Sequence, residues 1–329
     1  MTTKITVIGG SGFIGTNLCR QLASKQHDFE IIDLKMSHQF PEKCKIADVR
    51  DAQTLRKTIT GDVVVNLAAV HRDDIRDKSE YQHTNVHGAE NIAKVCVEKR
   101  IDKIVFTSSV AVYGFAEPGT DENGEINPFN EYGRSKFEAE EKLRNWQSEG
   151  DNSLIIVRPT VIFGEGNRGN VYNLLNQIAS GKFIMVGKGK NKKSMAYIRN
   201  VVAFLETCIS TEQKYGVYNY VDTPDLTMNE LVSQVRAKLK GKSGVGPRLP
   251  YWLGIILGYS ADLVAKISGK NLPVSSLRVK KFASSTEFKS AKAKLDSFRA
   301  PFLLSEGVER TLQSEFISQD INREIFYTE

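Results

Sequence analysis

The sequence predicts an α/β fold in which a doubly wound parallel sheet is followed by a smaller lobe. Short β-branched runs alternate with segments of helical period through the first half of the chain, which is the pattern of βαβ units. The strand runs are continuously apolar, as expected for strands that helices cover on both faces. After Pro159 the alternation gives way to a glycine-rich polar loop and longer helical segments, which predict the second lobe.

The apolar runs and the helical segments give the expected elements. Strands are expected at 5–8, 29–34, 62–67, 103–107, 154–157 and 218–221, and helices at 13–24, 84–99, 131–147 and 171–179. Thr227 and Glu230 form a capping box, which predicts a further helix through Leu239. We therefore assign 1–163 to the sheet domain, with 196–222 returning to it. The smaller C-terminal lobe takes 164–195 and 223–329.

The composition argues against several classes of protein. The 329 residues are 40% hydrophobic with a net charge of +6, which allows a sizeable core and favours anionic small molecules. Lysines and arginines are spread along the chain, which argues against nucleic acid as a partner. The four cysteines lie far apart, without a CxxC pair or histidines at metal-ligand spacing. We expect free thiols, no metal site and a reducing, cytoplasmic compartment.

The most apolar stretch of the chain is 249–268. Asp262 and Lys266 interrupt it, so no integral membrane span is expected there. The favoured interpretation is an amphipathic helix packed in the second lobe, and contact with a membrane surface is the alternative.

Three glycines follow the first strand at GxxGxxG spacing: Gly9, Gly12 and Gly15. The first allows a tight turn, the second lets backbone approach a pyrophosphate, and the third lets the next helix pack against the sheet. A dinucleotide phosphate would then lie at the N–H groups of Phe13 and Ile14, where the helix begins.

Asp33 ends the second strand, where a carboxylate accepts hydrogen bonds from adenosine ribose hydroxyls and repels a 2′-phosphate. NAD is therefore preferred over NADP, although Lys35 lies nearby and a solvated strand-end carboxylate is the alternative. Ligands of doubly wound sheets lie beyond the carboxyl ends of the strands. This places Asp48 and Val49 near the adenine, and Leu67 beside Ala68 and Ala69, whose small side chains leave room for the cofactor; ordinary loop residues are the alternative at both places.

Tyr132 and Lys136 form a YxxxK pair that shares one face of a predicted helix, with Asn130 as its N-cap. A neighbouring ammonium stabilises a phenolate and lowers its pKa, so Tyr132 can exchange a proton with a hydroxyl. By chance this pair occurs on many surface helices. Ser108 and Ser109 strengthen the interpretation, because they follow the 103–107 strand beside the expected nicotinamide, where one serine can contact the cofactor and the other can hold the reacting oxygen.

These motifs, in this order, resemble the extended short-chain dehydrogenase/reductase superfamily, in its nucleotide-sugar epimerase/dehydratase branch. The matching residues are Gly9, Gly12, Gly15, Asp33, Asp48, the Asn66–Ala69 run, Asn85, the Ser108–Gly114 run, Tyr132, Lys136, Arg158 and Pro159. The match is strong over the first half of the chain and looser beyond it.

The resemblance implies a Rossmann fold that binds NAD and a catalytic set of Ser109, Tyr132 and Lys136, with Lys136 also holding the nicotinamide ribose. It implies that Asn85 shapes the site and that Pro159 lies along the nicotinamide amide. Dehydratases and decarboxylases of the family carry acidic residues where this chain has Val110 and Ala111. Epimerase or ketone-reductase chemistry at C4 of the sugar is therefore favoured.

On the substrate side, the resemblance places a nucleotide-sugar diphosphate at Asn167, Arg168 and Asn170. Arg199 and Arg278 are further candidates, since a guanidinium fork matches phosphate oxygens, although each alone is as well explained as a solvated arginine. The turn 71–74 either lines the sugar pocket or is a charged surface turn.

Three functions remain open. The first is a nucleotide-sugar epimerase or 4-keto reductase, and the second is a dehydrogenase of an apolar alcohol such as a sterol, suggested by 249–268. The third is a non-catalytic NAD-binding protein, which the intact Ser109, Tyr132 and Lys136 set disfavours. Family analogy implies a homodimer through helices 84–99 and 131–147.

Overall fold

Seven parallel strands form the central sheet, in the order β10-β6-β5-β4-β1-β2-β3. The computed structural model describes residues 3–72, 75–269, 275–318 and 324–328. The strands are β1 (Ile5–Ile8), β2 (Phe29–Asp33), β3 (Cys44–Ile46), β4 (Val63–Asn66), β5 (Lys103–Thr107), β6 (Ser153–Pro159) and β10 (Tyr215–Tyr220). Because the winding direction reverses between β1 and β4, a crevice is expected at the carboxyl ends of these two strands.

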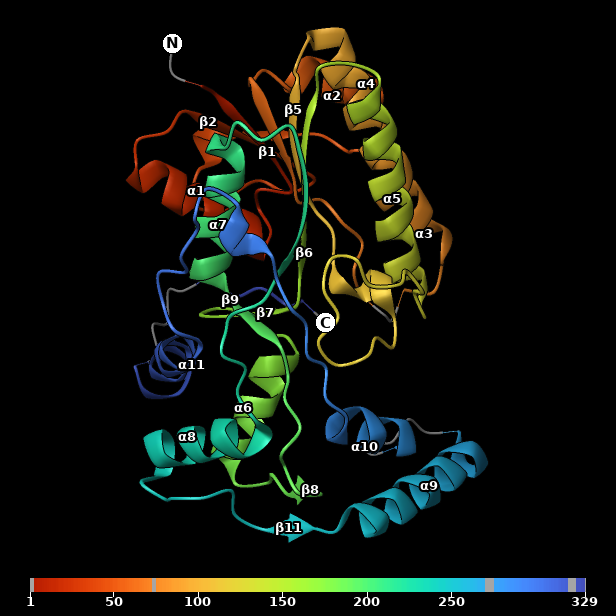
Figure 1. Ribbon diagram of the computed structural model, residues 1–329, viewed down its shortest axis with the longest axis vertical. Helices are drawn as coiled ribbons and strands as arrows, with labels where there is room; N and C mark the ends of the chain where they lie inside the picture. The colour runs from red at the N-terminus through yellow and green to blue at the C-terminus, as the bar shows by residue number, and fades with distance from the viewer. Residues whose placement is uncertain (1–2, 73–74, 270–274, 319–323, 329) are drawn as a thin grey trace.

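Helices cover both faces of the sheet, with α1 and α7 on one face and α4 and α5 on the other (Figure 1). The helices described are α1 (Phe13–Ser24), α2 (Ala52–Thr58), α3 (Ser79–Tyr81), α4 (Gly88–Lys99), α5 (Glu131–Ser148), α6 (Asn170–Ser180), α7 (Ile198–Ser210), α8 (Met228–Lys240), α9 (Tyr251–Ser268), α10 (Ser276–Ala283) and α11 (Leu304–Leu312). Along β5, Val105 packs into one core, whereas Ile104 and Phe106 pack into the other. The predicted doubly wound fold is confirmed.

The chain leaves the sheet after β6 and returns to it before the last helices. Short strands lie outside the large sheet: β7 (Val161–Phe163), β8 (Met185–Val186), β9 (Met195–Tyr197) and β11 (Arg248–Leu249). β7 pairs with β9, and β10 then pairs with β6 at the sheet edge. Phe298 lies against Phe204 and Tyr220, so part of the last third of the chain also packs on the sheet half.

The apolar stretch 249–268 forms a helix, α9, that packs on α10 as predicted, but its large apolar side chains are not the face that packs. Only Gly254 and Gly258 of this helix are buried. A Cβ on Gly258 would lie 2.7 Å from Cα of Ser276, so a strip of small residues packs on α10 while the large side chains face outward. The periodicity predicted the helix, but the small lobe offers too narrow a surface to cover it. Along the described chain, no helix is both long and apolar enough to cross a membrane.

A C-terminal segment, residues 324–328, returns to the middle of the molecule near β7 and β9 (Figure 1). The N–H of Phe326 donates to the carbonyl of Gly166 at 2.9 Å, and its carbonyl accepts from the N–H of Arg168 at 2.8 Å. The Phe326 ring lies 5.6 Å from the ring of Phe13 at the start of α1. This segment therefore contacts both the glycine turn after β1 and the loop after β7.

A buried ion pair ties α5 to β6. Glu140, which is fully buried, accepts from Nε of Arg158 at 2.8 Å and from its Nη2 at 2.5 Å. Nη1 of Arg158 donates to the hydroxyl of Tyr113 at 2.7 Å. Two parallel hydrogen bonds pair the guanidinium with the carboxylate away from water. Removal of either side chain would leave the other charge buried without a partner.

We expect Glu140→Ala to lower the free energy of unfolding by about 3–5 kcal/mol, because the Arg158 guanidinium would stay buried without its carboxylate. Urea unfolding followed by circular dichroism measures this change. Glu141→Ala is the matched control, since the Glu141 side chain is 52% exposed beside Arg144 and should cost less than about 1 kcal/mol. Equal losses in the two variants would contradict the assignment.

Candidate active site

The turn between β1 and α1 leaves the start of the helix open. Gly9 has φ +81°, and a Cβ there would lie 2.8 Å from the Ala68 nitrogen. A Cβ on Gly15 would lie 2.3 Å from the Gly9 carbonyl oxygen, so the helix packs close to the turn. Gly12 is the N-cap and provides no side-chain cap. The first N–H groups of α1 therefore have no side-chain cap, and such N–H groups are where a helix binds a phosphate.

Asp33 lies at the end of β2 beside this turn. Its carboxylate accepts from the N–H of Ser11 at 2.9 Å and from the N–H of Lys35 at 3.2 Å. Both donors are backbone groups, so no cation neutralises the carboxylate through these bonds. This is the placement that recognition of a ribose hydroxyl requires.

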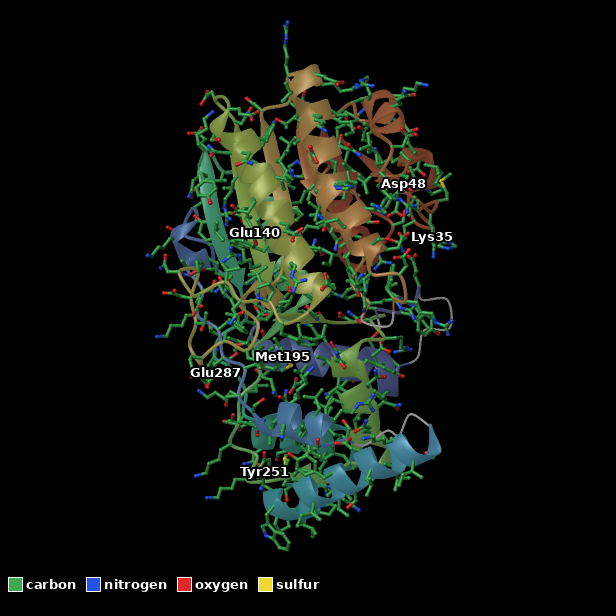
Figure 2. The ribbon with its side chains drawn as sticks, turned by 90° about the vertical axis from the view of Figure 1, so that its right-hand side faces the viewer. Lys35, Asp48, Glu140, Met195, Tyr251 and Glu287 are labelled. Carbon is green, nitrogen blue, oxygen red and sulfur yellow. The ribbon has the colours of Figure 1, made fainter. Side chains whose placement is uncertain are left out.

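Asp48 has a partner that the sequence did not reveal. Arg50 binds its carboxylate through Nε at 2.9 Å and Nη2 at 2.7 Å, and this hydrogen bonding lowers the pKa of Asp48. Lys35 and Asp48 lie on the same side of the molecule (Figure 2). Val49 is buried, because its side chain fills the space beside Gly88 of α4. Contact of Asp48 with adenine stays a prediction, and there the carboxylate would be shared with Arg50.

Asn85 fixes the loop after β4 to α5. It lies in a π-helical turn, Gln82–His87, a local geometry frequent at functional sites. Its side chain accepts from the N–H of Val70 at 2.8 Å and donates to the Val70 carbonyl at 2.9 Å. The same amide donates to the Ser135 hydroxyl at 2.9 Å. The predicted shaping role thus has a physical basis in three hydrogen bonds.

Hydroxyl groups gather where β5 ends. The side-chain oxygens of Thr107 and Ser108 are buried, and among the described residues they have no hydrogen-bond partner. Ser109 caps the short 3₁₀ turn Val110–Tyr113 by accepting from the N–H of Ala111 at 3.1 Å. Buried hydroxyls rarely stay unpaired, so this strand end has unused capacity for a bound polar group.

The first turn of α5 lies against the turn that Ser109 caps. Asn130 caps α5, as predicted, by accepting from the N–H of Gly133 at 2.9 Å. A Cβ on Gly133 would lie 2.4 Å from the carbonyl oxygen of Ala111. Only a glycine permits this approach, which brings the element that carries Tyr132 next to the one that carries Ser109.

Lys136, one turn beyond Tyr132, is buried between α5 and β5. Its Nζ donates to the Thr107 carbonyl at 2.7 Å and lies 4.7 Å from the centroid of the Phe106 ring. Burial lowers the pKa of Lys136 to about 7, while Glu140 on the next turn acts in the opposite direction. An ammonium with so low a pKa is sensitive to any charge that arrives beside it.

The two tyrosines of the motifs differ in environment. Tyr113 is buried, accepts from Arg158 and donates to the Asn219 side chain at 2.8 Å, and burial raises its pKa. Tyr132 is only partly buried on the helix face that carries Lys136. Tyr113 is therefore a structural residue, whereas proton exchange at Tyr132 stays a prediction.

The predicted substrate residues do not all lie together: Arg278 is on a different part of the molecule from the others. Arg168 forms an ion pair with buried Glu315, and its guanidinium lies 3.9 Å from the centroid of the Tyr172 ring. Arg199 lies 3.2 Å from Glu165. Asn167, Arg168 and Asn170 lie in and after the loop following β7, whereas Arg278 lies on α10, which packs on α9.

A family model described as the NAD dependent epimerase/dehydratase family matches residues 5–220. This range holds the glycine turn, Asp33, the β5 hydroxyls, Tyr132 and Lys136. The chain belongs to this family. The resemblance read from the motifs is thereby confirmed, and the chain is an NAD-dependent enzyme.

Two proteins of similar sequence and one solved structure are named as sugar 4-epimerases. N-acetyl-alpha-D-glucosaminyl-diphospho-ditrans,octacis-undecaprenol 4-epimerase of Escherichia coli O157:H7 is 49% identical over 323 residues, 96% of each chain. UDP-glucose 4-epimerase of Vibrio cholerae is 26% identical over 82% of this chain and 86% of its own. UDP-N-acetylglucosamine 4-epimerase from Bacillus cereus, a solved structure, matches with TM-score 0.73 and 19% identity, over 94% of this chain and 98% of that chain. This structural likeness confirms the fold.

The residues of this epimerase-family chain fit NAD. The open start of α1 suits a pyrophosphate, Asp33 suits a ribose diol, and the unpaired Thr107 and Ser108 hydroxyls lie where the Lys136 ammonium meets β5. These groups therefore offer hydrogen bonds to the pyrophosphate and to a ribose, with further hydroxyls and the Lys136 ammonium at the end of β5.

Several residues that build the site were missed at the level of sequence. Glu140 had a signal, because it continues the i, i+4 spacing of Tyr132 and Lys136. Glu165 and Glu315, which pair with two of the three predicted phosphate arginines, Arg199 and Arg168, had none, and Glu315 lies 147 residues from Arg168. Asp73 and Asp74 of the predicted charged turn lie outside the described residues.

The lowered pKa of Lys136 predicts a pH-dependent stability in protein free of NAD. The ordinary pKa is 10.5 and the folded value about 7, so the unfolded chain binds more protons between these two values. The free energy of unfolding should therefore rise with pH across this window, by at most about 1.4 kcal/mol per pH unit from this group.

Urea unfolding between about pH 7 and about pH 9 checks this expectation, and Lys136→Met should show a smaller rise than the wild type. Lys142→Met, on the same helix with an exposed side chain, should keep the wild-type slope. A wild-type slope in Lys136→Met would show that Lys136 is charged in the folded chain throughout this range.

Proposed function

We propose that this protein is a 4-epimerase of an N-acetylhexosamine linked through diphosphate to a polyprenol. The observation that carries the proposal is the 49% identity, over 96% of both chains, to an epimerase whose name states such a substrate. A nucleotide-linked sugar is the second candidate, supported by the UDP-glucose 4-epimerase relative. Both candidates present a diphosphate next to the sugar.

The proposed chemistry assigns one task to each member of the catalytic set. Ser109 holds the reacting oxygen, Tyr132 accepts the hydroxyl proton and later returns it, and Lys136 stabilises the phenolate between these steps. NAD, when bound, supplies reversible hydride acceptance. Between the two proton transfers the keto sugar must turn over, so that the returned hydrogen reaches its other face.

The residues after Ser109 support epimerisation over loss of water. Elimination of water requires a further acid and base near the sugar, and Val110 and Ala111 cannot serve as either. An apolar-alcohol dehydrogenase finds less support, because most of the large apolar residues of α9 are exposed.

A direct assay compares the substrates. Purified protein is incubated with NAD and either N-acetylglucosaminyl-diphospho-polyprenol or UDP-N-acetylglucosamine, and the released sugar is identified after mild acid hydrolysis. We expect N-acetylgalactosamine from the lipid-linked substrate, at a kcat/KM well above that for the nucleotide sugar. Turnover of only the nucleotide sugar would replace the lipid-linked proposal with the second candidate.

Tyr132→Phe should lower kcat by about 10²- to 10⁴-fold, because the phenol that exchanges the proton is removed. NAD affinity, measured by isothermal titration calorimetry, should stay nearly unchanged. Tyr113→Phe is the matched control and should keep kcat, since that hydroxyl contacts Arg158 and Asn219. Full activity in Tyr132→Phe would remove the proposed base.

We further propose a homodimer in the cytoplasm, with the outward faces of α4 and α5 as the interface. The support is family analogy, together with the 58% exposed Val97 on α4 and four free thiols. Light scattering coupled to size-exclusion chromatography measures the mass, and Val97→Glu should favour the monomer.

A further inference from the structure

We propose that the exposed face of α9 lies in the interface of an anionic lipid bilayer and holds the enzyme on the membrane. The inference rests on the proposed function, since a polyprenol-linked substrate resides in a bilayer. It adds the surface by which the protein reaches that substrate.

The face consists of a stripe of large apolar residues at helical spacing. These are Trp252, Ile256, Tyr259, Leu263 and Ile267, and each is more than half exposed. Trp252 is 64% exposed and Ile267 is 78% exposed. Leu257 and Val264 flank the stripe and are about half exposed. An apolar surface of this kind on a helix marks a contact with a partner or a membrane.

The opposite side of α9 is what fastens the helix to the protein. Gly254 lies against Val186, and Gly258 lies against the backbone of Ser276. The Asp262 carboxylate accepts from the N–H of Ser276 at 3.2 Å, so the single acidic group of α9 is turned toward α10. Because α9 contacts the rest of the protein through these small residues, its apolar stripe faces outward.

The charges around the stripe complement an anionic surface. Residues 240–286 contain eight lysines and arginines and one acidic residue, Asp262. Lys188, Lys190, Lys266 and Lys280 are exposed, and Nζ of Lys280 donates to the Tyr259 hydroxyl at 2.8 Å. A lysine-rich surface with a Trp and Tyr-bearing apolar face is the pattern of helices that lie in the membrane interface.

The position of α9 suits this role. It forms the end of the molecule farthest from the large sheet, with Tyr251 at its start (Figures 1 and 2). From there α10 leads back toward the site, because Nζ of Lys281 lies 5.1 Å from the centroid of the Phe129 ring. Phe129 stacks on the 74% exposed Phe115 at 4.7 Å and lies three residues before Tyr132. Exposed apolar side chains thus occur at both ends of this route.

A second copy of the chain is the competing occupant, and the charges oppose it. A twofold interface places the same patch on both partners, so the lysines around α9 would face one another. Anionic lipid headgroups remove that repulsion. The stripe is also short of what crossing requires, since α9 has 18 residues interrupted by Asp262 and Lys266.

The first experiment measures binding to vesicles without any substrate. Full-length protein is sedimented with vesicles of equal parts phosphatidylglycerol and phosphatidylcholine, and with vesicles of phosphatidylcholine alone. We expect binding to the anionic vesicles that weakens with added salt. Trp252 emission should shift to the blue, whereas the other tryptophan, Trp146, is 3% exposed and should not respond. Absence of both binding and shift would overturn the proposal.

Variants locate the contact. Leu263→Glu with Ile267→Glu should lower vesicle affinity by about tenfold or more, because both side chains would leave the apolar phase. Ile46→Glu, at a 50% exposed position on β3, should bind like the wild type. Equal binding by the α9 variant would overturn the proposal. A wild-type dimer in solution that becomes monomeric in the α9 variant would identify a copy-to-copy interface instead.

Activity separates this inference from the proposed function. The α9 variant should lose turnover of the long-chain lipid substrate in vesicles but keep turnover of a water-soluble short-chain analogue. Loss of both activities with retained vesicle binding would place α9 in the fold or the site and overturn the membrane role. Wild-type protein that binds vesicles yet epimerises neither substrate would refute the function while leaving the membrane contact standing.

Discussion

The site depends on one contact, the hydrogen bond from the buried Lys136 ammonium to the carbonyl of Thr107. It joins the second turn of α5 to the carboxyl end of β5, where the chain leaves the sheet. Gly133 lets the first turn of α5 approach the Ala111 carbonyl, and Asn85 holds the loop after β4 to Ser135. Together these contacts bring the elements that carry Tyr132, Lys136 and Ser109 to one edge of the sheet, which is the preorganisation that the proposed proton transfer requires.

The electrostatics of this edge follow from how Glu140 is used. Its carboxylate is one turn from Lys136, yet it accepts from Arg158 and from Arg144. Two guanidinium groups therefore bind this carboxylate, and although Glu140 raises the pKa of Lys136, burial still lowers it to about 7. The buried pair fastens α5 to β6 without holding Lys136 permanently charged. In the proposed mechanism, the ammonium can then respond to a phenolate that forms on Tyr132.

The sheet half was predictable because its requirements are local. A glycine at φ +81°, a close helix approach and an N-cap each demand a residue type at a set spacing, and Gly9, Gly15 and Asn130 meet these demands. Asp48 and Arg50 are also close in sequence, but their spacing alone does not show which neighbouring basic residue forms an ion pair with the carboxylate. The partner of Arg168 could not be predicted, since Glu315 reaches it only through the folded lobe.

For α9 too, the sequence predicted the element but not its contacts in the folded lobe. Its periodicity predicted a helix and its apolar content predicted burial, but burial depends on how much surface the rest of the lobe offers. Gly254 and Gly258 take the narrow contact that exists, and the large residues are left outside. An uncovered apolar stripe is costly in water, at about 25 cal/mol per Å² of apolar surface. Such a cost is tolerable in a chain that works against lipid, and the lysines around the stripe supply the attraction that keeps it there. The motif-rich half thus carries chemistry common to many relatives, while the lobe that the motifs do not describe decides where that chemistry is applied.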